Sequence, residues 1–455
     1  MKAWNPKTGP VNGPKYLFLA DMIEHDVAQG RLMPGDRLPP QRDIAEMFGV
    51  TVATVTKGIA EAARRGLVDA RKGSGTYVVD RVAQPDFGQA LSINLGLNIL
   101  PSAIVDDLLS RSLTDVSQRA ADPGCFAYAS YQAHDAAMVA SRVWLEKQGI
   151  PLGEDALPCH GVQQGLDAAL AAFLPAGRQI VLCEAYTYTG ILRAARHHGA
   201  SAHGVSLDSE GMCPDALEEA LRETGAAIVV VTPTVQNPTG RSMSTARRKA
   251  IARICRKHSV VLIEDAINMP LAGGEHEPIC VHAPDNTVLL TGYSKCTAPG
   301  VRLAFASVPD RARARFHEAL VATGWLAPRI FPELVAEMAN SGALDECLVR
   351  HRAEARERQH LVTRHLGKAN ENLLPSYHCW IDLPDSMPND RLLEAANADG
   401  VKITVSDHFC CENISPPRAI RISLGAEGQR SQVEAGIVRL SKVLKETGRM
   451  SDPII

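Results

Sequence analysis

Three residues with reactive or ring-shaped side chains follow short apolar runs of the kind that form buried strands. Asp265 comes after the run VVLI, Lys295 after the run VLLT, and Tyr188 after the run IVLC. In an α/β protein the carboxyl ends of parallel strands lie at one edge of the sheet, where ligands bind. A carboxylate buried there needs a cationic partner, and an aromatic ring can stack on a planar ligand. These residues predict a ligand site, although a core tyrosine would give the same pattern at Tyr188.

Two loops with constrained backbones accompany these residues. The turn GVQQG at 161–165 precedes an Ala/Leu-rich stretch over 166–173 that we expect to be helical. Free N–H groups at the start of a helix can bind an anion such as phosphate, although an ordinary strand-to-helix turn has the same composition. The loop TPTVQNPTG over 232–240 follows another apolar run and contains Asn237. A polar, proline-containing loop at the end of a strand is typical of a ligand site.

The elements that must hold these loops alternate along the chain. Apolar runs and amphipathic stretches follow one another from about residue 93 onward, which is the rhythm of βαβ units. We therefore predict an α/β major domain over 93–455, built on a mostly parallel sheet with helices on its faces.

Six short motifs occur in order in this domain: GVQQ, EAYTYTG, QNPTG, IED, YSKCTAPGVR and IRIS. With them the sequence resembles the fold-type I aminotransferases that use pyridoxal 5′-phosphate, and this resemblance implies a small C-terminal α/β domain from about residue 330. It also implies that Lys295 forms a Schiff base with the cofactor aldehyde and that Asp265 pairs with the pyridine N–H. Asn237 would hydrogen-bond the phenolic oxygen, and Tyr188 would stack on the ring.

The same resemblance assigns partners to the charged groups of the ligands. The cofactor phosphate would be held by the N–H groups of Val162 and Gln163, by Ser294 and by Arg302. Tyr128 would reach the phosphate bound in a partner subunit, because the family builds its sites at a dimer interface. Arg421 would grip the α-carboxylate of an amino acid through two parallel hydrogen bonds.

Two positions depart from the pattern of this family. Many members have a tyrosine three residues after the pyridine-binding aspartate, where this chain has Asn268. Many also have a phosphate-binding serine three residues before the lysine, where this chain has Gly292. Both losses leave cofactor attachment possible, but they put transamination in question.

The first 80 residues follow a different pattern. They predict three helices and two strands of a hairpin, over 15–29, 40–48, 52–65, 67–71 and 76–79. Gly49 is placed to end the second helix and Thr51 to cap the third. The stretches PGDRLPPQRDIAEMFGVTVATV and GLVDARKGSGTYV resemble the GntR family of bacterial DNA-binding domains. We therefore predict a winged helix-turn-helix over 1–80, followed by a linker over 81–92.

The GntR resemblance implies how this unit meets double-stranded DNA. The start of the third helix would lie in the major groove and the wing at the minor groove. The residues implied in DNA contact are Arg42, Thr51, Thr54, Lys57, Lys72 and Gly73. Val52 and Thr56 stand where many GntR readers have arginine, so base readout would rest on apolar contacts or on Lys57.

Charge and composition limit the classes of function. The chain has 455 residues and a formal net charge of -3, which excludes a globally basic nucleic-acid binder. Residues 1–80 carry 11 Lys+Arg and 9 Asp+Glu, so DNA contact is left to a small basic face. No apolar run approaches the roughly 20 residues of a membrane helix. The 11 Cys form no Cys-x-x-Cys pair, so we expect a cytoplasmic protein without a metal site.

A GntR-type unit joined to an aminotransferase-like domain is the arrangement of the MocR-type regulators, which this chain resembles over nearly its whole length. The resemblance implies a homodimeric transcriptional regulator that binds promoter DNA and senses pyridoxal 5′-phosphate or a small amino-containing effector. The alternative is a pyridoxal-phosphate-dependent aminotransferase acting on an amino acid, with a vestigial DNA-binding unit. A third hypothesis, a scaffold that only dimerises, predicts no cofactor spectrum.

Overall fold

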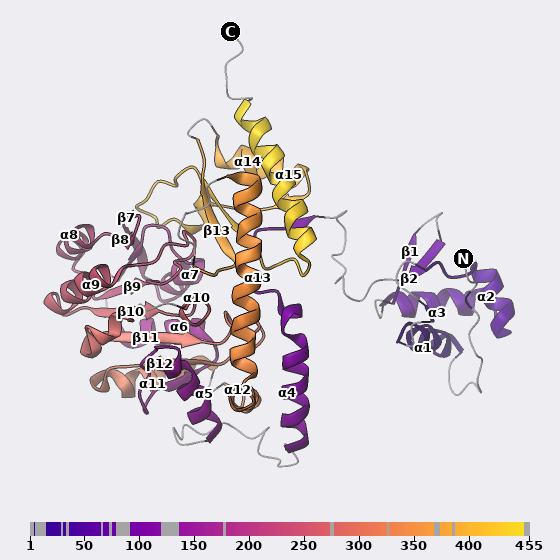
Figure 1. Ribbon diagram of the computed structural model, residues 1–455, viewed down its shortest axis with the longest axis horizontal. Helices are drawn as coiled ribbons and strands as arrows, with labels where there is room; N and C mark the ends of the chain where they lie inside the picture. The colour runs from indigo at the N-terminus through magenta and orange to yellow at the C-terminus, as the bar shows by residue number, and fades with distance from the viewer. Residues whose placement is uncertain are drawn as a thin grey trace, which may run out of the picture. The chain divides into compact units, whose positions relative to one another are not determined.

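The computed structural model divides the chain into two units, residues 1–90 and 91–455. It describes residues 4, 15–28, 31–32, 36–64, 67–71, 75–78, 92–119, 136–175, 179–273, 277–324, 327–367, 374–384 and 387–449 (Figure 1). Of the predicted linker over 81–92, only residue 92 lies within the described residues.

The N-terminal unit has three helices and a two-stranded hairpin, as predicted. Its elements are α1 (Lys15–Ala28), α2 (Gln41–Phe48), α3 (Val52–Arg64), β1 (Val68–Arg71) and β2 (Gly75–Val78). Gly49 ends α2 with a left-handed backbone of φ 56°. Thr51 caps α3, because its Oγ1 accepts the N–H of Thr54 at 3.2 Å. Fully buried side chains such as Ile44 and Val55 belong to one core shared by the helices and the hairpin.

A seven-stranded sheet in the order β4-β12-β11-β10-β9-β5-β6 forms the centre of the large unit. Its strands are β4 (Leu157–Cys159), β5 (Ile180–Glu184), β6 (Ser201–Val205), β9 (Ile228–Val231), β10 (Val261–Asp265), β11 (Thr287–Gly292) and β12 (Ala304–Ser307). The pairings from β6 through β5, β9 and β10 to β11 are parallel, whereas β12 is antiparallel to both its neighbours. The sheet is mixed and mostly parallel, which confirms the predicted α/β class.

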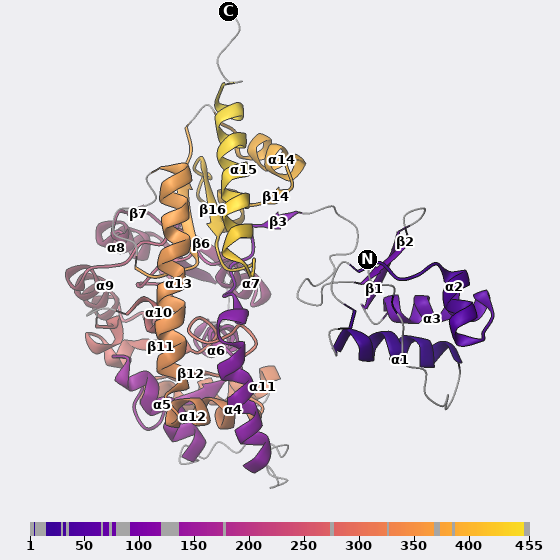
Figure 2. The ribbon, with the colours of Figure 1, turned by 45° about the vertical axis from the view of Figure 1, so that its right-hand side comes forward.

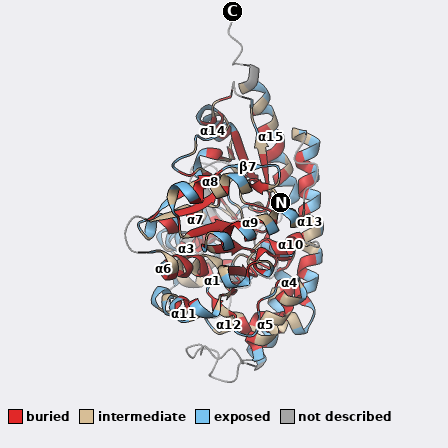
Figure 3. Cartoon of the chain, turned by 90° about the vertical axis from the view of Figure 1, so that its left-hand side faces the viewer, coloured by how far each residue is buried: buried red, intermediate tan, exposed pale blue. Residues whose placement is uncertain are grey.

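Helices cover both faces of this sheet. Alternate residues of a strand point to opposite faces, and in β9 Ile228 and Val230 pack with α6, α7 and α11, while Val229 and Val231 pack with α8 and α9. These helices are α6 (Val162–Phe173), α7 (Thr189–His197), α8 (Pro214–Thr224), α9 (Thr245–Lys257) and α11 (Asp310–Gly324). Because both faces are covered, the central strands are buried, and exposed residues gather on the outer sides of the helices (Figure 3).

Further elements of the large unit surround this layered core. The helices are α4 (Asp106–Arg119), α5 (Ala136–Lys147), α10 (Met269–Ala272) and α12 (Ile330–Asn340). The short strands and 3-10 turns are β7 (Leu207–Asp208), β8 (Gly211–Met212), η1 (Ser102–Ile104), η3 (Ile279–Val281), η4 (Pro284–Asn286) and η5 (Ser406–Phe409). One apolar cluster joins α4, α5 and α12 to the β11–β12 region, so these helices extend the core at that end of the sheet.

A smaller α/β layer forms the C-terminal part of the chain. Its antiparallel sheet has the order β13-β16-β15, and β14 pairs in parallel with β3 from the start of the unit. The elements are β3 (Ile93–Asn94), α13 (Ala343–Leu366), β13 (His378–Asp382), α14 (Asn389–Ala398), β14 (Val401–Lys402), β15 (Thr404–Val405), β16 (Ala419–Ser423) and α15 (Arg430–Arg449). The long helix α13 runs beside α15 and continues alongside the large sheet (Figures 1 and 2).

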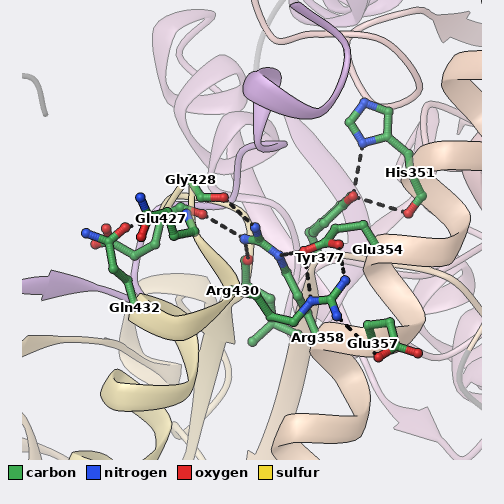
Figure 4. Close-up of polar contacts among 11 residues, drawn as sticks. His351, Glu354, Glu357, Arg358, Tyr377, Glu427, Gly428, Arg430 and Gln432 are labelled. Atoms are coloured by element: carbon green, nitrogen blue, oxygen red, sulfur yellow. Dashed lines mark hydrogen bonds and ion pairs between the residues drawn. The ribbon is translucent and has the colours of Figure 1, made fainter. Parts of the chain in front are cut away.

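A buried arginine ties these helices to the loop that precedes α15 (Figure 4). Arg358 on α13 is 1% exposed and donates to the carbonyls of Glu427 at 2.7 Å and Gly428 at 2.8 Å. Glu354 pairs with Arg358 and also with Arg430 of α15. Each nitrogen of this buried guanidinium therefore meets at least one acceptor, which offsets the cost of burying its charge.

The loop between β16 and α15 tests this packing. At Gly425 an added Cβ would lie 1.9 Å from the carbonyl oxygen of Ile99, whereas at Gly428 an added Cβ meets nothing within 4 Å. We expect Gly425→Ala to lower the free energy of unfolding by about 1–3 kcal/mol, because the backbone must shift to admit the methyl group. Gly428→Ala is the matched control and should change it by less than about 0.5 kcal/mol. Urea denaturation of both variants measures this, and equal midpoints would contradict the packing described here.

Candidate functional site

The predicted site residues meet at the carboxyl edge of the large sheet. Asp265 is the last residue of β10, and Lys295 comes three residues after the end of the neighbouring strand β11. Tyr188 lies between β5 and α7, and Asn237 lies in the loop after β9. Because β5, β9, β10 and β11 are consecutive parallel strands, these four positions share one edge, as the sequence predicted.

Lys295 presents a partly buried amine. Its Nζ donates to the backbone carbonyl of Asn98 at 2.8 Å. Burial and the guanidinium of Arg421 lower the pKa of Lys295 to about 8, against the opposing effect of Asp265. A sizeable fraction of this amine is therefore neutral near physiological pH, which is the form that adds to a carbonyl carbon.

Asp265 is a buried carboxylate with few partners. It is 8% exposed, and its Oδ1 accepts the N–H of Ile267 at 3.1 Å. Burial raises its pKa to about 6, although that N–H and the charge of Lys295 act in the opposite direction. Within the described residues, Asp265 makes no ion pair. A ligand with a protonated ring nitrogen would supply the missing cationic donor.

An anion-binding cradle forms at the start of α6. Gly161 precedes the helix with φ 79°, and a Cβ there would approach Nη2 of Arg302 to 2.2 Å. The guanidinium therefore lies directly against this glycine, next to the N–H groups of Val162 and Gln163 in the first helical turn. A helix start and a guanidinium together favour a phosphate or a similar anion. Ser294, partly buried, precedes Lys295 in the turn after β11.

Tyr188 covers a second glycine beside this cradle. A Cβ at Gly190 would lie 2.1 Å from Cε1 of Tyr188 and 2.2 Å from Oε1 of Gln163. Gln163 donates through Nε2 to the carbonyl of Gly190 at 3.2 Å, while its buried Oε1 has no partner in the described structure. Burial, and secondarily the carboxylate of Asp265, raise the pKa of Tyr188. The phenol thus lies within electrostatic reach of the carboxylate.

Arg421 on β16 supplies a buried guanidinium with an unused donor. It is 7% exposed, and Nη1 donates to Oδ1 of Asn237 at 3.0 Å while Nη2 donates to the carbonyl of Gly96 at 2.7 Å. Its Nε is buried without an acceptor among the described residues. The guanidinium lies 4.7 Å from the ring centroid of Phe409, and burial lowers its pKa to about 10. A buried, incompletely paired arginine is suited to a carboxylate ligand.

The two departures from the family pattern have structural reasons. Nδ2 of Asn268 donates to the carbonyl of Val235 at 2.8 Å, so this side chain is committed to the backbone. A Cβ at Gly292 would lie 2.7 Å from the carbonyl oxygen of Leu303, so the backbone leaves no room for a serine there. An anion bound at the start of α6 would therefore receive no hydroxyl from position 292.

Two residues that the sequence did not single out also belong to this site. Asn98 provides the carbonyl that accepts from Lys295. His378 lies 2% exposed at the start of β13, with Nε2 at 3.1 Å from the carbonyl of Gln236 and Nδ1 at 3.4 Å from Nδ2 of Asn98. Burial, then Arg421, lower the pKa of His378 to about 3, so the imidazole is neutral. The one available signal was a histidine within the otherwise apolar stretch HCWI.

The predicted DNA-contact residues of the N-terminal unit lie around the first turns of α2 and α3. Arg42 on α2 and Lys57 on α3 are exposed. The hydroxyls of Thr51 and Thr54 lie 2.9 Å apart, at the start of α3. Val52 beside them is 44% exposed.

Thr56 is exposed on α3, next to Gln41 of α2. Its Oγ1 lies 2.8 Å from Oε1 of Gln41 and 2.9 Å from the carbonyl of Val52, so the hydroxyl is held within the unit. Three predicted contact residues, Lys72 and Gly73 in the wing and Tyr128 in the large unit, lie outside the described residues.

The described residues contain no group of three or more His, Cys, Asp or Glu side chains placed to hold a metal ion. They also contain no helix long and apolar enough to cross a membrane.

Comparisons with known proteins agree with both units. The aminotransferase class I and II family matches residues 92–440, and the gntR family of bacterial regulatory proteins matches residues 15–78. The HTH-type transcriptional regulator YdeF of Bacillus subtilis is 27% identical, over 98% of this chain and 97% of its own. The vitamin B6 salvage pathway transcriptional repressor PtsJ of Salmonella typhimurium is 26% identical, over 82% of this chain and 86% of its own.

Solved structures agree with the fold of the large unit. The multiple substrate aminotransferase from Thermococcus profundus superposes with a TM-score of 0.70 at 22% identity, over 80% of this chain and 93% of its own. The large unit thus has the fold of these aminotransferases, and the N-terminal unit is a GntR-type helix-turn-helix. The chain belongs to the aminotransferase class I and II family and is a helix-turn-helix transcriptional regulator of the MocR type.

Proposed function

We propose that the large unit binds pyridoxal 5′-phosphate at this site and that the regulator senses the cofactor or a small amino-containing effector there. The observation that carries the proposal is a partly neutral lysine and a buried carboxylate with no ion pair among the described residues, which lie at or just after the ends of neighbouring strands. Lys295 supplies the amine that a carbonyl compound needs, and Asp265 supplies the acceptor that a protonated ring nitrogen needs.

In this proposal, different residues of the site bind different parts of the cofactor. Arg302, Ser294 and the first turn of α6 hold the phosphate, since a guanidinium and free N–H groups converge there. Tyr188 covers the ring face, and Asn237 donates to the phenolic oxygen through its Nδ2, because its Oδ1 already accepts from Arg421. When bound, the cofactor supplies an aldehyde that reacts reversibly with primary amines.

Arg421 extends the site toward an effector. A ligand carboxylate would accept from the unused Nε with one oxygen and from Nη2 with the other, in place of the Gly96 carbonyl, while Nη1 keeps Asn237. An amine on the same ligand would then compete with Lys295 for the cofactor. We propose that this competition changes the occupancy of promoter DNA by a homodimer. Linkage requires the effector to bind one DNA-binding geometry more tightly than the other.

A second candidate function is transamination, and the retained pair of Lys295 and Arg421 favours it. Asn268, committed to the carbonyl of Val235, opposes it, because the hydroxyl that many family members have at this position is missing. Multiple-turnover transamination of amino acid and 2-oxo acid pairs would support the enzyme, whereas rates equal to those of free cofactor would exclude it.

The assignment of Lys295 predicts a spectroscopic loss. Adding pyridoxal 5′-phosphate to the full-length protein should give the visible absorption of a lysine-attached cofactor, and Lys295→Ala should abolish that absorption. Lys249→Ala, which removes an exposed lysine on α9, is the matched control and should keep it. Unchanged absorption in Lys295→Ala would place the attachment at another amine.

The lowered pKa of Lys295 predicts a pH dependence. The neutral amine is the reactive form, so the rate of cofactor attachment should rise with pH, pass through half its maximum near pH 8 and level off at higher pH. Arg421→Met removes a cation that disfavours the charged amine, and the midpoint should then rise by about one pH unit. Stopped-flow absorbance measures both midpoints, with the exposed Arg253→Met as control. A midpoint near that of an ordinary lysine in the unaltered protein would contradict the electrostatics described above.

The exposed Val52 predicts recognition of a thymine methyl group. We expect the protein to bind a footprinted fragment of its own upstream region. Replacing the contacted thymine by deoxyuridine, which lacks the methyl, should weaken binding about fourfold, since a buried methyl contributes about 0.8 kcal/mol. In Val52→Ala the same replacement should have little effect, while Val349→Ala, an exposed valine on α13, should behave as the unaltered protein.

Mobility-shift titrations with and without pyridoxal 5′-phosphate provide these affinities. Absence of any shift in both conditions would exclude the regulator proposal. A shift that is insensitive to every thymine replacement would leave DNA binding intact and exclude Val52 as the reader.

A further inference from the structure

A short backbone segment links the two ligand-facing cations of the site. The carbonyl of Gly96 accepts from Nη2 of Arg421 at 2.7 Å and from Oγ1 of Thr404 at 3.0 Å. Two residues later, the carbonyl of Asn98 accepts from Nζ of Lys295 at 2.8 Å. Residues 96–98 therefore lie between the proposed carboxylate-binding arginine and the proposed cofactor-binding lysine, with a carbonyl on each.

His378 fixes the lysine end of this segment. The carbonyl of Gln236 lies 3.1 Å from Nε2, and a carbonyl only accepts, so Nε2 carries the proton of the imidazole. Nδ1 is then the acceptor for Nδ2 of Asn98 at 3.4 Å. The contact with Gln236 is itself held in place, since Oε1 of Gln236 accepts both the N–H and the hydroxyl of Thr239.

Both nitrogens of His378 are thus committed, and no hydrogen bond to Lys295 is available to them. The cations Lys295 and Arg421 face the imidazole and, with burial, keep it neutral. His378 cannot act as a proton carrier while it is held between Gln236 and Asn98. Its influence on Lys295 runs through the position of Asn98.

We propose that His378 is a positioning residue which, through the side chain of Asn98, holds the Asn98 carbonyl against the amine of Lys295. The proposal rests on the proposed cofactor site, and in it the His378–Asn98 contact sets the reactivity of Lys295. The same carbonyl would be available to accept from the amine of Lys295 when that amine is not attached to the cofactor. The Gly96 carbonyl at the other end of the segment accepts from Arg421, so a carboxylate bound to Arg421 would change the contact that holds this end.

The test measures Lys295 in the full-length protein without cofactor. Brief acetylation with limiting acetic anhydride at a series of pH values, followed by mass spectrometry of the Lys295 peptide, gives the midpoint at which this amine becomes reactive. In the unaltered protein we expect a midpoint near 8, set by burial, Arg421 and Arg302 against Asp265. A carbonyl acceptor stabilises the charged amine, so losing it should lower the midpoint by about one pH unit.

Variants at both ends of the link make the result specific. His378→Leu and Asn98→Ala should each lower the midpoint, and the double variant should lower it no further, because both remove one link. His378→Gln can still donate to Gln236 and accept from Asn98, and should restore the midpoint. Cys379→Ala truncates a buried neighbour on β13 outside the link, and should leave the midpoint unchanged.

The outcomes separate this proposal from the proposed function. An unchanged midpoint in folded Asn98→Ala overturns the positioning role, whether or not His378→Leu folds. A lowered midpoint in Cys379→Ala overturns it as well, because general loosening of β13 would then suffice. Since the labelling uses no cofactor, its result stands even if the visible absorption expected with pyridoxal 5′-phosphate fails to appear.

Discussion

The burial of a carboxylate without a cation is the constraint on which the large unit depends. Three carboxylates lie at the ends of β5 and β10, and two are satisfied by the protein itself. Glu264 accepts the N–H groups of Ile279 and Cys280, and Glu184 accepts that of Thr232. Asp265 accepts the N–H of Ile267 and has an amine nearby but no ion pair among the described residues. The first two therefore stabilise the loops at this edge, while Asp265 keeps an acceptor for a ligand.

The ends of helices and strands could be predicted from the sequence, whereas most contacts between distant parts of the chain could not. Gly49, Thr51 and the proline-rich turns mark the ends of their own elements, so the N-terminal unit followed the predicted boundaries closely. The strand ends that carry Asp265 and Lys295 were visible because each follows an apolar run. Asn98 and His378 could not be found this way, since they are 280 residues apart and meet only when the small layer packs against the lysine turn.

The positions where the sequence departs from its family show why contacts must be known before a loss is interpreted. At Gly292 the carbonyl of Leu303 excludes any side chain, so the missing serine reflects the path of the backbone. In the DNA-binding unit, Thr56 is exposed, but its hydroxyl is already engaged by acceptors on Gln41 and Val52, while the apolar side chain of Val52 is exposed beside it. Without knowledge of these contacts, the residues at positions 292 and 56 would both be interpreted as simple losses of polar groups.

A sensor and an enzyme need the same binding contacts but differ in the handling of protons. The groups proposed to hold a phosphate, a ring nitrogen and a carboxylate are Arg302, Asp265 and Arg421. The group that departs is the phenol which many family members carry at position 268, and its replacement is locked to a backbone carbonyl. The side chains proposed to bind the ligand are thus retained, whereas the side chain that would tune the ring oxygen for proton transfer is absent. This chain also carries a DNA-binding unit. The loss of the phenol with retention of the binding groups therefore favours a regulator that responds to ligand binding, in preference to an enzyme that converts a substrate.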